Sequence, residues 1–320
     1  MRHHLRHIAI AALFVLIAQG AQVYDAQAEL ARVDFVVDTP QTSIFKAAFR
    51  NSFPMADSVL PHKKDPRRLG IELTAPSAIV VDADTGRVLF SKNIGEKRTL
   101  ASLTKLMTAL VYEDLKLNPK TEIEMSEDDR QSVGKYHFEP GDVFTRGELF
   151  QVALGASSNN VVAALVRTSG LTREYFVARM NAKAEELGID ANFVEPTGLN
   201  ALNQSTALGV EKMLRAAMQY ADIRRATTSP SISIVSKAGK KYKVDVTNEL
   251  LGTFLDRKPY GIIGGKTGFI DEAGYCLAQA VKYGGHTIDI IVLGATAHEL
   301  RFQEVKSLAV WTFDAFTWEL

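Results

Sequence analysis

The sequence has very little cysteine: Cys276 is the only one among its 320 residues. A single cysteine excludes an intrachain disulfide, and it leaves the redox compartment undetermined. Cys276 lies in the apolar run Tyr275-Cys276-Leu277-Ala278, so we interpret it as a packed small side chain and not as a thiol nucleophile. Any covalent chemistry must therefore come from other side chains.

Neither sign of charge is in excess, because Lys plus Arg and Asp plus Glu both number 37. This balance gives no support to a nucleic-acid-binding protein. The histidines also lack metal-ligand spacing, since His298-Glu299 is not followed by a second histidine at the metalloprotease distance. We therefore expect no metal site, no cofactor and no nucleic-acid partner.

The apolar run at residues 8–18 is too short for a comfortable membrane span. It follows a basic start and precedes small residues, which predicts a secretory signal peptide over residues 1–28 that ends at Ala26-Gln27-Ala28. We expect export to the periplasm or the cell-wall space; an uncleaved anchor is the alternative. Residues 29–73 contain prolines and a basic run, which indicate an extended, solvated linker, with weak association with membrane or wall polymer as the alternative.

The rest of the chain divides into strand-rich and helical parts. The β-rich runs at 77–82 and 87–90 surround an Asp/Thr/Gly turn and predict a hairpin. Tight turns join further strand-like runs, which predicts antiparallel pairing of residues 262–269, 274–281 and 287–293. We expect an α+β fold with an antiparallel five-stranded sheet over residues 74–117 and 248–320, flanked by helices that include 299–316.

Residues 118–247 predict an all-helical subdomain inserted into this sheet. The capping box Thr145-Arg146-Gly147-Glu148 predicts a helix that ends near Gly155. The connection that follows carries Ser157-Ser158-Asn159 before a helix at 161–166, and residues 173–187 predict another helix, ended by Gly188. We expect an active site where the two parts meet.

A serine and a lysine stand three residues apart within residues 100–108. On one helix their Cβ atoms would lie about 5–6 Å apart, so the Lys105 amine can reach the Ser102 hydroxyl. Apolar residues at helical spacing predict that this helix is buried, and burial favours a neutral, proton-accepting amine. The pattern alone is weak evidence, because residues 43–46 and 132–135 match it too.

Two later motifs provide the groups that a serine nucleophile needs. Ser157 can pass a proton to a leaving amine, and the Asn159 amide can pair with a peptide backbone. Lys266 and Thr267 offer a cation and a hydroxyl to a substrate carboxylate.

Glycine is frequent around this last motif, in the segment Gly261-Ile262-Ile263-Gly264-Gly265-Lys266-Thr267-Gly268. Few side chains then cover the strand edge, so an extended peptide can pair with it. The backbone N–H groups of Ser102 and Phe269 are the expected oxyanion donors.

The three motifs occur in the order found in penicillin-binding proteins and serine β-lactamases. From Ser77 to Ala315 the sequence resembles the low-molecular-mass penicillin-binding proteins, the serine D-Ala-D-Ala peptidases of peptidoglycan. The stretches 193–199, 205–207 and 248–251 extend the resemblance.

This resemblance implies the penicillin-binding-protein/serine β-lactamase-like fold and a D,D-peptidase catalytic domain over residues 74–320. It implies Ser102 as the acylated nucleophile, Lys105 as its base and Ser157 as the third catalytic residue. It also implies stem peptides as substrates, β-lactams as covalent inhibitors, and a role in cell-wall biogenesis and cell shape.

Several alternatives remain open. A D,D-carboxypeptidase removes the terminal D-alanine, whereas a D,D-endopeptidase cuts the D-alanyl cross-link, and both need the same residues; the short segment after Gly268 is similar to the endopeptidases. A serine β-lactamase needs a deacylating carboxylate, and the loop from Glu195 to Asn200 has one residue too many for that pattern. A non-catalytic penicillin-binding sensor or scaffold would not need Lys105 or Ser157.

Overall fold

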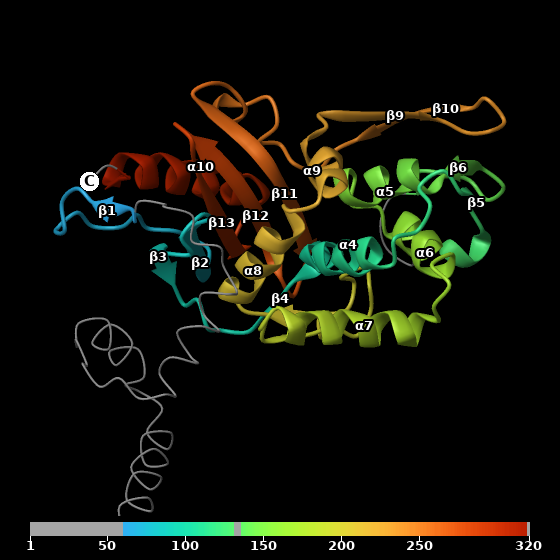
Figure 1. The fold of residues 1–320 in the computed structure, drawn as a ribbon, viewed down its shortest axis with the longest axis horizontal. Coiled ribbons are helices and arrows are strands. Elements are labelled where there is room, and N and C mark those ends of the chain that lie inside the picture. The colour runs from blue at the N-terminus through green and yellow to red at the C-terminus, as the bar shows by residue number, and fades with distance from the viewer. Residues whose placement is uncertain (1–59, 131–135, 319–320) are drawn as a thin grey trace, which may run out of the picture. The chain divides into compact units, whose positions relative to one another are not determined.

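The computed structural model describes residues 60–130 and 136–318 (Figure 1). The predicted signal peptide, most of the predicted linker and the two competing serine–lysine patterns lie outside the described residues. Among the residues that are described, no helix is both long and apolar enough to cross a membrane.

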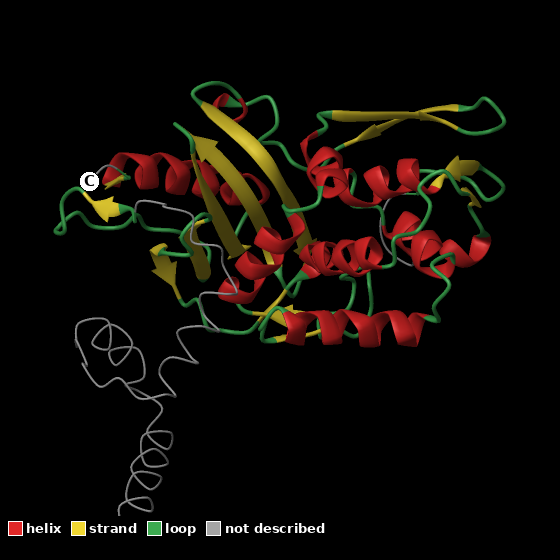
Figure 2. Cartoon of the chain, in the orientation of Figure 1, coloured by secondary structure: helices red, strands yellow, loops and turns green. Residues whose placement is uncertain are grey.

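The largest sheet of the described residues, among the strands drawn in yellow in Figure 2, is antiparallel and five-stranded. Its strand order is β11-β12-β13-β2-β3. Its strands are β2 (Ser77–Asp82), β3 (Val88–Lys92), β11 (Tyr260–Ile270), β12 (Gly274–Tyr283) and β13 (His286–Ala295). Pairing between β13 and β2 joins the two ends of the described chain into one sheet. The predicted sheet is confirmed, and β11 and β3 are its two edge strands.

Helices cover both faces of this sheet, so β2 is buried along its whole length. Successive side chains of a strand point to opposite faces. Val80 packs with Ile290 in the core beneath α10 (His298–Ala315), whereas Ile79 belongs to the core on the side of α8 (Ala207–Ala217). Helix α4 (Thr104–Asp114) packs in turn on α8 (Figure 1).

The helical part contains α5 (Arg146–Gly155), α6 (Asn159–Arg167), α7 (Arg173–Glu186) and α9 (Ala221–Thr228). The predicted capping box is present: the Thr145 N–H donates to Glu148 Oε2 at 2.8 Å, and the Glu148 N–H donates to Thr145 Oγ1. Helix α5 ends at Gly155 as predicted. Gly188 follows the end of α7 with φ +60°, a conformation that glycine adopts without strain.

This part was expected to be all helical, but it also contains two-stranded antiparallel sheets. The hairpin of β9 (Ser231–Val235) and β10 (Lys241–Asp245) has an alternating pattern, with Ile232, Ile234 and Val244 buried on one face. A second two-stranded antiparallel sheet pairs β5 (Glu122–Glu124) with β6 (Val143–Thr145). These segments form strands and not helices because the apolar side chains on one face of the hairpin pack against the core of the helical part.

The remaining elements are short and connect the larger ones. They are β1 (His62–Lys63), β4 (Arg98–Thr99), η1 (Ala101–Leu103), η2 (Glu127–Asp129), β7 (Ala191–Asn192), β8 (Gln204–Ser205), η3 (Phe254–Asp256) and β14 (Phe316–Thr317). Two placements differ from expectation: Ser102 lies in the 3₁₀ turn η1 just before α4, and Asn159 is the first residue of α6.

The capping box generates a stability prediction. Replacing Thr145 by alanine removes the acceptor of the Glu148 N–H and should lower the free energy of unfolding by about 1 kcal/mol. Urea unfolding measures the change. Thr145→Ser keeps the hydroxyl and serves as the control; a loss as large in the serine variant would mean that the cap hydroxyl contributes nothing.

Candidate active site

The predicted serine–lysine contact is present at the start of α4. Lys105 Nζ donates a hydrogen bond of 2.9 Å to Ser102 Oγ. The turn that carries Ser102 begins with Ala101 at φ +47°, a left-handed conformation that is uncommon for a residue with a side chain. Such strain is common at functional sites, where the surrounding structure holds it in place.

Lys105 is fully buried and bound on three sides. Besides Ser102, its Nζ donates to Asn159 Oδ1 of α6 and to the backbone oxygen of Thr197, each at 2.6 Å. Removal from water lowers the pKa of Lys105 to about 7, although the negative charge of Glu195 acts in the opposite direction. Near neutral pH, the amine can therefore both accept and return a proton.

Lys266 of β11 forms the second cationic position. It is 2 % exposed, and its Nζ donates to Ser157 Oγ at 2.8 Å and to the Thr267 backbone oxygen at 2.9 Å. Burial, together with the positive charges of Lys105 and Arg301, lowers the pKa of Lys266 well below its ordinary value. Ser157 adopts φ +59°, so the opposite side of the site also has a strained residue.

Gly268 allows β11 to approach the turn of Ser102. A Cβ atom at this glycine would lie 2.9 Å from the Leu100 backbone oxygen and 3.3 Å from the Leu103 nitrogen. The next amide along β11 belongs to Phe269, so the two expected oxyanion donors lie on segments that contact each other. Gly198 packs against the same turn, where a Cβ would lie 1.9 Å from the Ala101 oxygen.

Glu195 organises the loop that presents the Thr197 oxygen to Lys105. Its carboxylate accepts hydrogen bonds from the Thr197 N–H at 2.6 Å and from Asn203 Nδ2 at 2.9 Å, and it also binds the Gly198 N–H. Both carboxylate oxygens are thus occupied within the loop. The β-lactamase alternative requires a carboxylate that is free to activate a deacylating water, and Glu195 is not free to do so. The sequence did not predict this supporting role of Glu195.

Arg301 of α10 is a second residue that the sequence analysis missed. Its guanidinium is buried, donates to the Gly268 backbone oxygen at 3.2 Å and lies 5.5 Å from the centre of the Tyr275 ring. Burial lowers the pKa of Arg301, but the side chain adds to the positive potential near Lys266. Nothing in the sequence distinguishes it from the other charged residues of this helix, such as Glu304 and Lys306.

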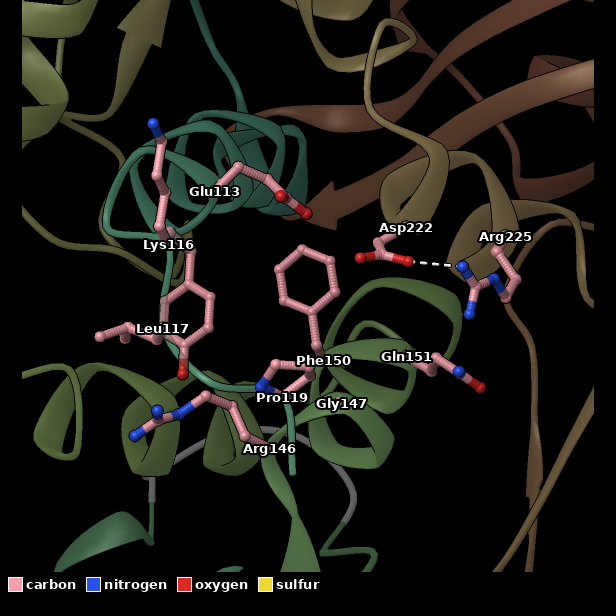
Figure 3. A pocket seen from close by; sticks show the side chains of 11 residues that line it. Glu113, Lys116, Leu117, Pro119, Arg146, Gly147, Phe150, Gln151, Asp222 and Arg225 are labelled. Atoms are coloured by element: carbon pink, nitrogen blue, oxygen red, sulfur yellow. Dashed lines mark hydrogen bonds and ion pairs between the residues drawn. The ribbon is translucent and has the colours of Figure 1, made fainter. Parts of the chain in front are cut away.

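Within the described ranges, no group of three or more His, Cys, Asp and Glu side chains could hold a metal ion. A separate cavity of about 200 Å³ lies between α4, α5 and α9 (Figure 3). Phe150 projects into it, and Asp222 and Arg225 form an ion pair of 2.6 Å at its side. None of the predicted site residues lines this cavity, so we distinguish it from the active site.

Comparison with known proteins identifies the family. The model of Peptidase S11, D-alanyl-D-alanine carboxypeptidase, matches residues 62–297. The chain belongs to this family. It is therefore a serine D,D-peptidase, and the resemblance that its motifs indicated is confirmed.

The relatives include D-alanyl-D-alanine endopeptidases and D-alanyl-D-alanine carboxypeptidases. The D-alanyl-D-alanine endopeptidase of Pseudomonas aeruginosa is 33 % identical over 264 residues, which cover 81 % of this chain and 84 % of the relative. That of Escherichia coli is 31 % identical and covers 75 % and 77 %.

Two solved structures confirm the fold. A DD-transpeptidase from Streptomyces matches with a TM-score of 0.71 at 26 % identity, covering 77 % of this chain and all of that one. A cefotaxime-bound penicillin-binding protein of Listeria monocytogenes matches over the same shares, with a TM-score of 0.66 at 26 % identity.

The contact at Gly268 generates a prediction about acylation. Gly268→Ala should slow acylation by a penicillin by about tenfold to a hundredfold, because the added methyl pushes β11 away from Ser102. Gly261→Ala is the matched control on the same strand, since a Cβ there meets no atom within 4 Å. Stopped-flow measurement of both variants checks this; equal rates in the two would contradict the proposed role of the close approach.

Proposed function

We propose that this protein hydrolyses D-alanyl peptide bonds in peptidoglycan stem peptides through an acyl-enzyme on Ser102. The single observation that carries this proposal is the buried Lys105 amine, 2.9 Å from Ser102 Oγ, with a pKa lowered to about 7. A serine hydroxyl needs an adjacent base to become a nucleophile, and a base works best when its pKa lies near the working pH.

Acylation begins when Ser102 Oγ attacks the carbonyl carbon of D-alanine and its proton passes to Lys105 Nζ. The N–H groups of Ser102 and Phe269 stabilise the negative charge on the tetrahedral oxygen. Collapse of the intermediate breaks the C–N bond. The departing amine takes a proton from Ser157 Oγ, and the proton held by Lys105 replaces it, which returns both residues to their starting states. The products of this step are the acyl-enzyme and a free amine.

Deacylation repeats these steps with water as the nucleophile. Lys105 accepts a proton from water, the water oxygen attacks the ester carbon, and Ser102 leaves with its proton restored. β-Lactams react with Ser102 in the same way, because their ring amide resembles the scissile bond. Since Glu195 is engaged within its own loop, slow release of the penicilloyl group is expected.

Recognition of the substrate depends on the cations at β11. Lys266 and Thr267 are proposed to bind a carboxylate on the leaving side of the scissile bond, and Arg301 strengthens the positive potential there. Asn159 is proposed to orient the substrate backbone while its oxygen holds Lys105. The bare edge of β11 is proposed to pair with the acyl-donor peptide.

We also propose export to the periplasm or the cell-wall space, and a role in cell-wall biogenesis and cell shape. The basic, apolar and small-residue order at the N-terminus supports export. Residues 60–73 do not form the solvated linker that was expected, because β1 pairs with β14, and Ile71 and Leu73 pack against the core beneath α10. Charge pairing within this segment also gives little support to membrane or wall association. Arg67 pairs with Asp65 at 3.2 Å and Arg68 pairs with Asp314, which neutralises part of the basic run.

Removing the nucleophile tests the proposal. Ser102→Ala should abolish both labelling by a fluorescent penicillin and release of D-alanine or cross-linked fragments from isolated peptidoglycan, as resolved by mass spectrometry. Retention of either activity would place the nucleophile elsewhere. Labelling of the unaltered protein without any peptide cleavage would instead favour the sensor or scaffold, and rapid turnover of nitrocefin would favour a β-lactamase.

The pKa of Lys105 predicts a pH dependence. Because the neutral amine is the active form, kcat/KM for acylation should rise about tenfold per pH unit below pH 7 and level off above it. Lys105→Arg keeps a cation that cannot act as a base and should lower the rate by about 10²–10⁴-fold at every pH. A profile that stays flat from pH 5.5 to 8 would exclude Lys105 as the base.

A further inference from the structure

Beyond the site of the leaving group, the cleft opens into a cavity of about 540 Å³. Ser157 and Thr247 line both the cavity and the active site, since Ser157 binds Lys266 and Thr247 Oγ1 lies 2.6 Å from Thr267 Oγ1. The volume lies within the range of about 300–1,000 Å³ that is typical of ligand pockets. The cavity therefore continues from the proposed carboxylate-binding residues.

One wall of this cavity is the segment Ala156-Ser157-Ser158-Asn159, and the opposite wall is β10 with Val246 and Thr247. Tyr136 and His137 also line it, and His137 Nδ1 lies 3.1 Å from Ser158 Oγ. Consecutive residues of β10 line the wall, although neighbouring side chains of a strand point in opposite directions. The cavity must therefore face the edge of β10, where the backbone is accessible.

The register of the hairpin shows which backbone groups point into the cavity. The Ser236 N–H donates to the Lys240 oxygen, so this pair is hydrogen-bonded. Hydrogen-bonded and non-hydrogen-bonded pairs alternate along an antiparallel ladder. Lys243, opposite Ser233, and Asp245 are therefore in non-hydrogen-bonded positions, with their N–H and C=O groups directed away from β9.

Thr247 confirms the direction of this edge. It follows Lys243 and Asp245 at the same two-residue interval, and its N–H donates to the Gly155 oxygen at 3.0 Å, at the end of α5 beside Ala156. In the part of the chain that the structure describes, β10 pairs only with β9, and neither Lys243 nor Asp245 forms a further backbone–backbone hydrogen bond. The free edge thus faces the Ser157 side of the cavity.

We infer that this cavity binds the second stem peptide of a cross-linked substrate as an added strand along β10. The inference rests on the proposed function and specifies its substrate. When Ser102 is acylated, the expelled amine belongs either to a single D-alanine or, in a cross-link, to a diamino acid that continues into a second peptide. A free D-alanine ends at Lys266, whereas the second peptide must extend past Ser157 and Thr247. This geometry favours endopeptidase activity.

A series of leaving groups tests the inference on the unaltered protein. We compare kcat/KM for three synthetic substrates: a stem pentapeptide ending in D-Ala-D-Ala, a cross-link to the diamino acid alone, and a cross-link to a complete second stem peptide. The complete dimer should react at least about tenfold faster than its truncated form, which corresponds to about 1.4 kcal/mol.

The outcomes separate the inference from the proposed function. Equal rates for the complete and truncated dimers would overturn the inference but leave D-alanyl hydrolysis intact. If none of the three substrates is cleaved, the proposed function itself fails.

A pair of proline variants tests the strand edge directly. Lys243→Pro removes an N–H that points into the cavity without removing a hydrogen bond to β9. It should lower kcat/KM for the complete dimer by about tenfold and change D-alanine release and penicillin acylation by less than twofold. Ser233→Pro is the matched control, because Ser233 is the partner of Lys243 and directs its N–H to the opposite edge of the hairpin.

Lys243→Ala keeps the backbone N–H and separates its effect from that of the side-chain charge. This variant should cleave the dimer at the normal rate. Loss of dimer cleavage in Ser233→Pro as well, or an equal loss on the pentapeptide in Lys243→Pro, would overturn the assignment of the β10 edge. Because the leaving-group series uses the unaltered chain, it decides the question even where a variant fails to fold.

Discussion

The active site depends on taking one lysine out of water. Full burial makes the charged form of Lys105 costly, and this lowers its pKa to about 7. Burial alone would leave the amine without partners, so three acceptors from three segments surround it: Ser102, Asn159 and the Thr197 oxygen. The sheet-side turn, the helical part and the Glu195 loop must therefore all be correctly placed before the amine has its proposed reactivity.

Close backbone approach brings these segments together. Gly268 and Gly198 leave no side chain between the Ser102 turn and its neighbours, and Ala101 and Ser157 adopt left-handed conformations in the two segments that bear the reacting hydroxyls. Each left-handed residue costs about 1–3 kcal/mol and persists only where the surrounding structure over-determines it. Strand β11 supplies that support, since the Ser102 turn packs against it and its Lys266 binds Ser157.

The sequence predicted those features that depend on local pattern. The five sheet strands have β-rich runs and tight turns, the start of α5 has a capping box, and the three motifs lie where the structure brings them together. The features that it did not predict depend on backbone conformation, on contacts between residues far apart in the chain, or on a weak local pattern. The left-handed Ala101, which keeps Ser102 out of α4, leaves no sign in the sequence. Arg301 reaches Gly268 only because α10 folds back across the sheet. Apolar and polar residues do alternate in the sequence of β9 and β10. The neighbouring segments have helical patterns, however, so the whole region was predicted to be helical.

The nearness of Lys105, Lys266 and Arg301 has a consequence for ligand binding. Repulsion among these groups adds to burial and lowers the pKa of Lys266. A bound carboxylate acts in the opposite direction, because its negative charge stabilises the protonated form of the Lys266 amine. Binding of an anionic substrate should therefore raise the pKa of Lys266 and favour proton uptake, and the heat of binding should then vary with the ionisation enthalpy of the buffer.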